Sequence, residues 1–150
     1  MNYPLDAFRR VDMREVAPGT LATSQGMWLL KLENDGHGTP QMMILAGNDA
    51  GSVSNAAGPA FAVSGEYSWG VYFDSLDFDR NHEARPAVSI GADGVIIHGH
   101  AWRERMFEKP VNTAGARVAT DPATYYCRSF SIWLTGRDGN RLGDTALLSV

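Results

Sequence analysis

Cysteine is nearly absent from this chain. Cys127 is the single one, so no intramolecular disulfide can form. Secreted domains of this size often carry an even set of cysteines, and a single cysteine therefore predicts a reducing, cytoplasmic location. No apolar run approaches the roughly 20 residues that a membrane-spanning helix needs, and the first residues lack the apolar stretch of an export signal. We expect neither membrane insertion nor export, although a phage component would look the same.

Positive charge is also scarce. Lys and Arg number 13 against 17 Asp and Glu, which gives a formal net charge of −4. Such a chain presents no broad basic field to phosphate groups, so we do not expect nucleic acid as a partner. Charged residues make up 20% and hydrophobic residues 44% of the sequence, which is the composition of a folded protein. A length of 150 residues predicts one domain over residues 1–150.

Helical patterns are scarce as well, and period-two alternation takes their place. Two segments alternate most clearly, and each is predicted to turn one face to a core: Tyr67, Trp69, Val71 and Phe73 in the first, and Tyr126, Phe130, Ile132 and Leu134 in the second. The opposite face of the second segment carries Cys127, Ser129, Ser131 and Trp133.

Further strands are predicted between glycine-containing and proline-containing turns. They cover residues 21–24, 27–33, 41–46, 60–64, 87–90, 95–102 and 146–150. The turn at 91–94 predicts that 87–90 pairs antiparallel with 95–98. Residues 5–14 fit a short helix or an alternating strand, residues 102–109 fit a short helix, and residues 47–58 and 112–122 are predicted to be loops.

No alternation of strands with helices is present, so a parallel sheet is not expected. Many short strands with regular turns predict an all-β fold. We expect an antiparallel β-sandwich or a small closed β-barrel of about seven to nine strands, with at most one or two short helices.

Two histidines provide the sharpest chemical signal. An extended reading of residues 95–102 projects His98 and His100 from the same face of one strand, where imidazoles can hold a metal ion. Glu104 follows four residues after His100 and would add a carboxylate. The alternative is a pair of hydrogen-bonded or partly exposed histidines without a metal, and we favour it.

The segment His98, Gly99, His100, Ala101, Trp102, Arg103 and Glu104 resembles part of the first motif of the cupins, an all-β family. The resemblance implies a catalytic metal held by His98, His100 and Glu104. It covers about seven residues and departs from the family in its glycine spacing. A cupin also has a later histidine, whereas here the third imidazole would come from His82 or His37.

A second polar segment and the lone thiol carry weaker signals. Asp77, Asp79, Asn81 and Glu83 alternate as calcium ligands can, but the segment lacks the rest of an EF-hand, so we favour a solvated loop. Cys127 lies within a predicted strand and is interpreted as a structural thiol. The short motifs of serine hydrolases, P-loop proteins and dinucleotide-binding enzymes are absent.

The aromatic residues are more numerous than a minimal core requires. Most of the four tryptophans and five tyrosines are expected in the core. Tyr125 and Trp133 are predicted to be surface contact residues. The apolar residues 146–150 would form an adhesive edge strand unless they pair within the fold or with another copy.

These observations favour a non-catalytic β-domain that acts as a binding, accessory or assembly module, with a protein partner or self-association and no cofactor. Two alternatives remain open. One is a cupin-like enzyme that uses a divalent transition metal held by His98, His100, Glu104 and His82. The other is a small-ligand carrier with an apolar pocket inside a barrel.

Overall fold

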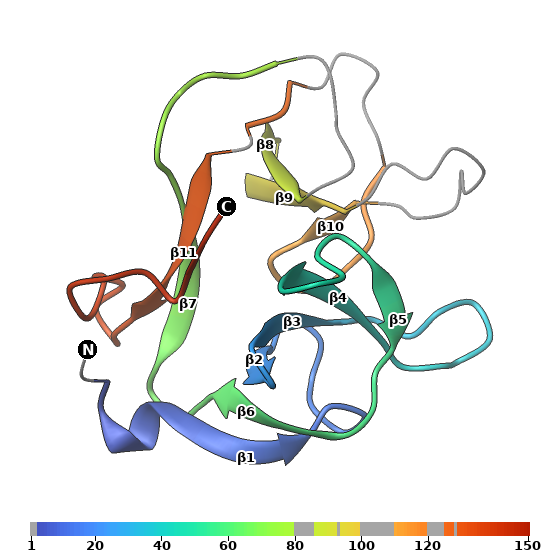
Figure 1. Ribbon diagram of the computed structural model, residues 1–150. Helices are drawn as coiled ribbons and strands as arrows, with labels where there is room; N and C mark the ends of the chain where they lie inside the picture. Colours follow the sequence, from blue (N-terminus) through green and yellow to red (C-terminus); the bar gives the residue numbers. More distant parts are fainter. Residues whose placement is uncertain (1–2, 80–85, 93, 100–109, 120–124, 128) are drawn as a thin grey trace.

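The computed structural model describes residues 3–79, 86–92, 94–99, 110–119, 125–127 and 129–150. These residues form twelve strands and one 3-10 turn (Figure 1). The elements are η1 (Leu5–Ala7), β1 (Phe8–Asp12), β2 (Leu21–Ser24), β3 (Met27–Leu32), β4 (Gln41–Ala46), β5 (Val53–Asn55), β6 (Pro59–Val63), β7 (Ser68–Phe73), β8 (Ala87–Gly91), β9 (Gly94–His98), β10 (Val111–Asn112), β11 (Phe130–Thr135) and β12 (Leu148–Ser149). No described segment is a helix with the length and apolar character needed to cross a bilayer.

All strand pairs are antiparallel, and the strands form three open sheets. The largest has the order β1-β6-β2-β3-β4-β5, and the other two have the orders β10-β9-β8 and β12-β11-β7. The all-β antiparallel class is confirmed. The closed barrel was wrong, because each sheet ends in two edge strands. The count of seven to nine strands was also wrong. Short edge strands, which pair with only one neighbour, are too short to show an alternation of apolar and polar residues in the sequence.

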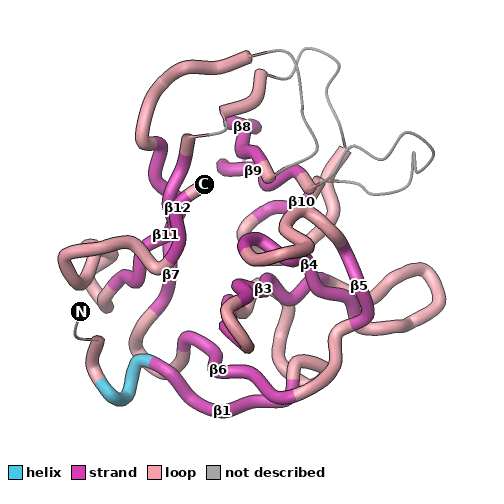
Figure 2. Tube along the Cα trace, viewed as in Figure 1, coloured by secondary structure: helices cyan, strands magenta, loops and turns pink. Residues whose placement is uncertain are grey.

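The additional strands β1, β5 and β10 lie where the sequence pattern is ambiguous or typical of a loop (Figure 2). β1 occupies part of 5–14, where helix and strand were both open. β5 lies within the predicted loop 47–58, and β10 lies at the start of the predicted loop 112–122. The expected strands 21–24 and 41–46 are confirmed, as is the hairpin, in which Ala87 pairs with His98. The predicted helix at 102–109 lies outside the described residues.

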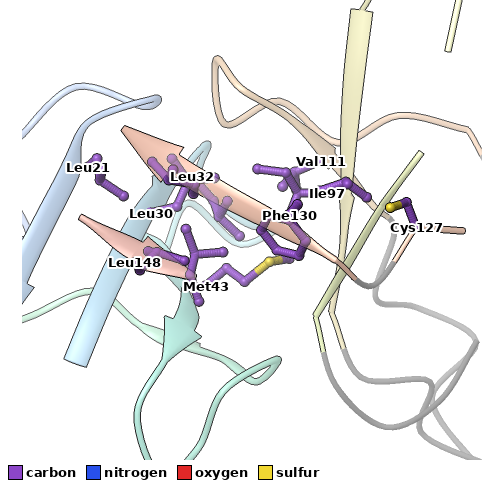
Figure 3. Close-up of a cluster of buried hydrophobic side chains, with 12 residues drawn as sticks. Leu21, Leu30, Leu32, Met43, Ile97, Val111, Cys127, Phe130 and Leu148 are labelled. Atoms are coloured by element: carbon purple, nitrogen blue, oxygen red, sulfur yellow. The ribbon is translucent and has the colours of Figure 1, made fainter. Parts of the chain in front are cut away.

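One hydrophobic core is shared by all three sheets. Figure 3 shows Phe130 of β11 among side chains from the other two sheets, with Met43 below it and Ile97 and Val111 above. Phe130, Ile97 and Val111 have no exposed surface, and Met43 is 1% exposed. Trp69, Val71 and Phe73 of β7 pack against this core, as their alternation predicts. The core therefore joins segments of the chain that are far apart in the sequence.

The central strands of the largest sheet are buried on both faces. Leu30 and Leu32 of β3 point into the shared core, whereas Leu29 belongs to a second cluster with Ala22 and Ile44 on the other face. Burial on both faces explains why β3 appears in the sequence as an apolar run rather than as an alternation.

Lys31 lies on that second face and is 3% exposed. Its ammonium donates hydrogen bonds to the carbonyl oxygens of Val16 at 2.8 Å and Arg14 at 3.2 Å. Burial lowers the pKa of Lys31, and the carboxylate of Asp12 acts in the opposite direction. A buried cation requires such partners, so Lys31 holds the 14–16 turn against the sheet.

The loop after β10 approaches the largest sheet through a glycine. Gly115 has φ of +79° and accepts a hydrogen bond from the backbone N–H of Glu33 at 2.9 Å. A Cβ atom on Gly115 would collide with the carbonyl oxygen of Lys31 and lie 2.8 Å from the Gly19 nitrogen. Gly139 has φ of +80°, and a Cβ atom added to it would have no other atom within 4 Å.

These two glycines give a matched pair of substitutions. Gly139→Ala should cost about 1–2 kcal/mol of unfolding free energy, because only the left-handed backbone is penalised. Gly115→Ala should cost about 1–3 kcal/mol more, since backbone atoms must also move. Urea denaturation measures both values. Equal losses in the two variants would show that the close approach of the loop contributes nothing.

Candidate functional site

The segment Tyr125–Cys127 fastens two distant parts of the chain together. Tyr126 exchanges two backbone hydrogen bonds with Asp79, at 2.6 and 2.8 Å. Cys127 does the same with Val88 of β8, at 2.7 and 2.9 Å. Because successive residues of an extended segment face opposite sides, Cys127 points into the shared core and Tyr126 points away from it.

This arrangement corrects two expectations. Residues 126–134 do not form one continuous strand, since β11 starts at Phe130 and Tyr126 and Cys127 make isolated bridges. The expected faces are therefore exchanged at the start of the segment. Cys127, which was expected on the face opposite the core residues, is fully buried in the core. Its sulfur lies 3.4 Å from the carbonyl oxygens of Ser75 and Ser129, which fits a structural role.

His98 lies on the side of the β8–β9 hairpin that faces away from the core. The hydroxyl of Ser89 and Nε2 of His98 are 2.7 Å apart, and the two residues are 2% and 6% exposed. Ala87, which is directly opposite His98, has a small side chain, so the imidazole can lean towards Ser89 on the diagonal. The Tyr126 ring meets the imidazole edge-on, with 4.7 Å between ring centroids.

The predicted metal ligands are only partly described. His98 is buried and bonded to Ser89, whereas His100, Glu104 and His82 lie outside the described residues. His37 is exposed in the turn between β3 and β4. Among the described residues, no three His, Cys, Asp or Glu side chains are grouped as a metal site requires. The metal hypothesis stays a prediction, which metal analysis of protein purified without chelators tests.

An open cleft of about 590 Å³ lies beside this segment. Its walls carry carboxylates, hydroxyls and aromatic rings, and they consist of Ser75, Asp77, Phe78, Asp79, Tyr126, Ser129 and Val150. The ring of Phe78 packs against the ring of Phe73, with 5.6 Å between the ring centroids. Tyr126 thus has one neighbour in the buried Ser89–His98 pair and also forms part of the cleft wall.

Two large apolar side chains beside the cleft are exposed to solvent. Leu76 is 77% exposed and Tyr125 is 49% exposed. Tyr125, which was predicted as a contact residue, directly precedes the wall residue Tyr126 in the sequence. Of the four residues with a calcium-loop alternation, Asp77 and Asp79 line the cleft, whereas Asn81 and Glu83 lie outside the described residues.

Trp133, the second predicted contact residue, is half-buried on the outer face of β11. Its indole N–H donates to the hydroxyl of Ser131 at 3.0 Å, and that hydroxyl donates to Asp74 at 2.9 Å. The guanidinium of Arg141 lies 4.5 Å from the Trp133 ring centroid and 5.1 Å from that of Tyr72. The indole is held in one orientation, with the cation over it.

A second, smaller pocket of about 310 Å³ lies over β1, β2 and β6. It is mostly apolar, and Phe61, which is 55% exposed, forms part of it together with Arg10 and Pro59. Thr23, Ser24 and Gln25 also line it, but its walls expose less polar surface than those of the cleft at Tyr126.

The cleft and the buried Ser89–His98 pair behind Tyr126 could be predicted only partly from the sequence. The expected pairing of 87–90 with 95–98 already places Ser89 and His98 on one face, so that register could have identified the pair. The pairing of Asp79 with Tyr126 joins segments 47 positions apart, and no local pattern signals it.

No protein-family model, curated protein or solved structure matches this chain. Function is therefore inferred from the geometry of the described residues.

The buried Ser89–His98 bond can be tested through stability. Ser89→Ala leaves a buried imidazole nitrogen without this partner and should cost about 1–3 kcal/mol. Ser149→Ala, an exposed position in β12, should change the unfolding free energy by less than about 0.5 kcal/mol. Thermal or chemical denaturation compares the two variants, and a neutral Ser89→Ala would mean that the bond does not form in solution.

Proposed function

We propose that this chain is a non-catalytic binding module that takes its ligand in the cleft at Tyr126. The observation that carries the proposal is the composition of the cleft walls. Two carboxylates, two serine hydroxyls and two aromatic rings surround a volume of about 590 Å³, within the range of roughly 300–1,000 Å³ typical of small-molecule sites.

The chemistry of the walls defines the class of ligand. Asp77 and Asp79 accept hydrogen bonds, and the hydroxyls of Ser75 and Ser129 both donate and accept them. Phe78 and Tyr126 add apolar surface. A small molecule with several hydroxyl or ammonium donors and one apolar face complements these walls, whereas a carboxylate would meet two like charges.

Binding is favoured over catalysis because of where the reactive groups lie. Ser89 and His98 are within the distance of a nucleophile and its base. Both are almost fully buried, and neither belongs to the cleft wall. The groups that do line the cleft suit recognition. The carrier alternative depended on a barrel interior, and the open sheets remove that basis.

Three sequence-based expectations belong to the same proposal. The shared core between facing sheets supports classifying the fold as a β-sandwich within one domain. The lone, buried Cys127 supports a reducing, cytoplasmic location. A protein partner or a second copy remains the expected macromolecular contact.

The ligand class can be tested by nuclear magnetic resonance with neutral sugars, primary amines and carboxylic acids as three probe sets. We expect sugars or amines, and not acids, to shift the backbone amide signals of residues 75–79, 126 and 129. Loss of a charge-assisted hydrogen bond of about 1.5–3 kcal/mol in Asp77→Asn should weaken that binding by about tenfold or more.

Asp49→Asn is the matched control, because it removes one negative charge from an exposed position outside the cleft. It should leave the affinity unchanged. Equal weakening by both variants would indicate a nonspecific charge effect, and shifts confined to another surface would overturn the proposal.

A further inference from the structure

The edge strands of the three sheets are protected to very different degrees. β1 carries Arg9, Arg10 and Asp12, while β5, β10 and β12 contain only two or three residues each. The outer edge of β8 is occupied by Cys127. β7 is different, because it has six residues, Ser-Trp-Gly-Val-Tyr-Phe, and no charge.

The direction of the free backbone groups of β7 follows from one hydrogen bond. The N–H of Asp74 donates to the carbonyl of Ser129 at 2.9 Å, in register with the β7–β11 pairs. Hydrogen-bonding residues alternate along an antiparallel strand, so Gly70 and Tyr72 also face β11. Trp69, Val71 and Phe73 therefore direct their N–H and C=O groups to the outer edge, where no backbone hydrogen bond to a described residue is present.

Natural proteins usually protect such an edge with lysine, proline, a bulge or a covering segment. The described residues provide none of these along β7. We propose that β7 pairs antiparallel with β7 of a second copy of this chain, about a twofold axis at Val71. This proposal does not depend on the cleft or on its ligand.

Twofold axes at Gly70, Val71 and Tyr72 all keep the core-facing residues of β7 on one side, and only the axis at Val71 uses the whole strand. A twofold axis at Val71 sets Val71 against its own copy and Trp69 against Phe73 of the second chain. The backbone N–H and C=O groups of Trp69, Val71 and Phe73 then all form hydrogen bonds with the second chain. An axis at Gly70 would instead pair Trp69 with Val71 and place Phe73 opposite Tyr67, beyond the end of the strand.

Charge and side-chain size agree with the axis at Val71. Gly70 lies opposite Tyr72 of the second copy, so the residue without a side chain faces a bulky one. Asp74 lies opposite Ser68, and no two like charges are directly opposed along the strand. The three-stranded sheet becomes a continuous six-stranded sheet across the two copies, which is the common size for a sheet.

Sedimentation velocity from micromolar to millimolar concentration tests the dimer. We expect the wild-type mass to rise to twice the 16.3 kDa of one chain. Val71→Pro removes an outward N–H that β11 does not use, and proline is tolerated at such edge positions. It should reduce the mass to that of one chain. Val71→Ala keeps the N–H and should still dimerise.

Hydrogen exchange on the wild-type protein provides a second measurement that needs no variant. The amides of Trp69, Val71 and Phe73 should be protected at high concentration and lose that protection on dilution, whereas those of Gly70 and Tyr72 stay protected. A monomeric wild-type mass, a Val71→Pro dimer, or outward amides that exchange freely at all concentrations would each overturn the proposal.

Discussion

The rest of the structure depends on the mutual burial of three sheets around Phe130. Two of these sheets contain only three strands, and such small units do not hold their shape without a packed face. Each sheet contributes fully buried side chains to the same cluster, so the apolar surface of one is covered by the other two. This packing also determines the shape of the cleft. Cys127 holds residues 125–127 against the core, and its neighbour Tyr126 forms part of the cleft wall.

The polar groups on the reverse sides of the strands follow from the same packing. Val88 and Ile97 of the hairpin fill the core, and this orientation turns Ser89 and His98 to the other side. On β11, the burial of Phe130 and Ile132 likewise turns Ser131 and Trp133 outward. In both places a short hydrogen-bonded chain satisfies the polar groups and fixes a ring. The side chains that face a ligand or solvent are thus oriented by residues that touch neither.

The sequence predicted the strands 21–24 and 41–46 and the hairpin 87–98, where one signal dominated without a break. The hairpin 87–98 has a clear turn and apolar strands, and its register followed correctly. β5 and β10 were missed because strands of two or three residues are stabilised by their neighbours rather than by their own pattern. Cys127 was assigned to the wrong face because the alternation was extended through a break in the strand. The cleft could not be assembled, since the bond between Asp79 and Tyr126 depends on the path of the whole chain.

The solitary thiol has a consequence for following the folding of this protein. Cys127 has no exposed surface and lies where the edge of the hairpin meets the shared core. A thiol-reactive dye cannot reach its sulfur until that junction separates. The rate of labelling in native buffer therefore measures how often the structure opens at Cys127, and no probe residue has to be introduced.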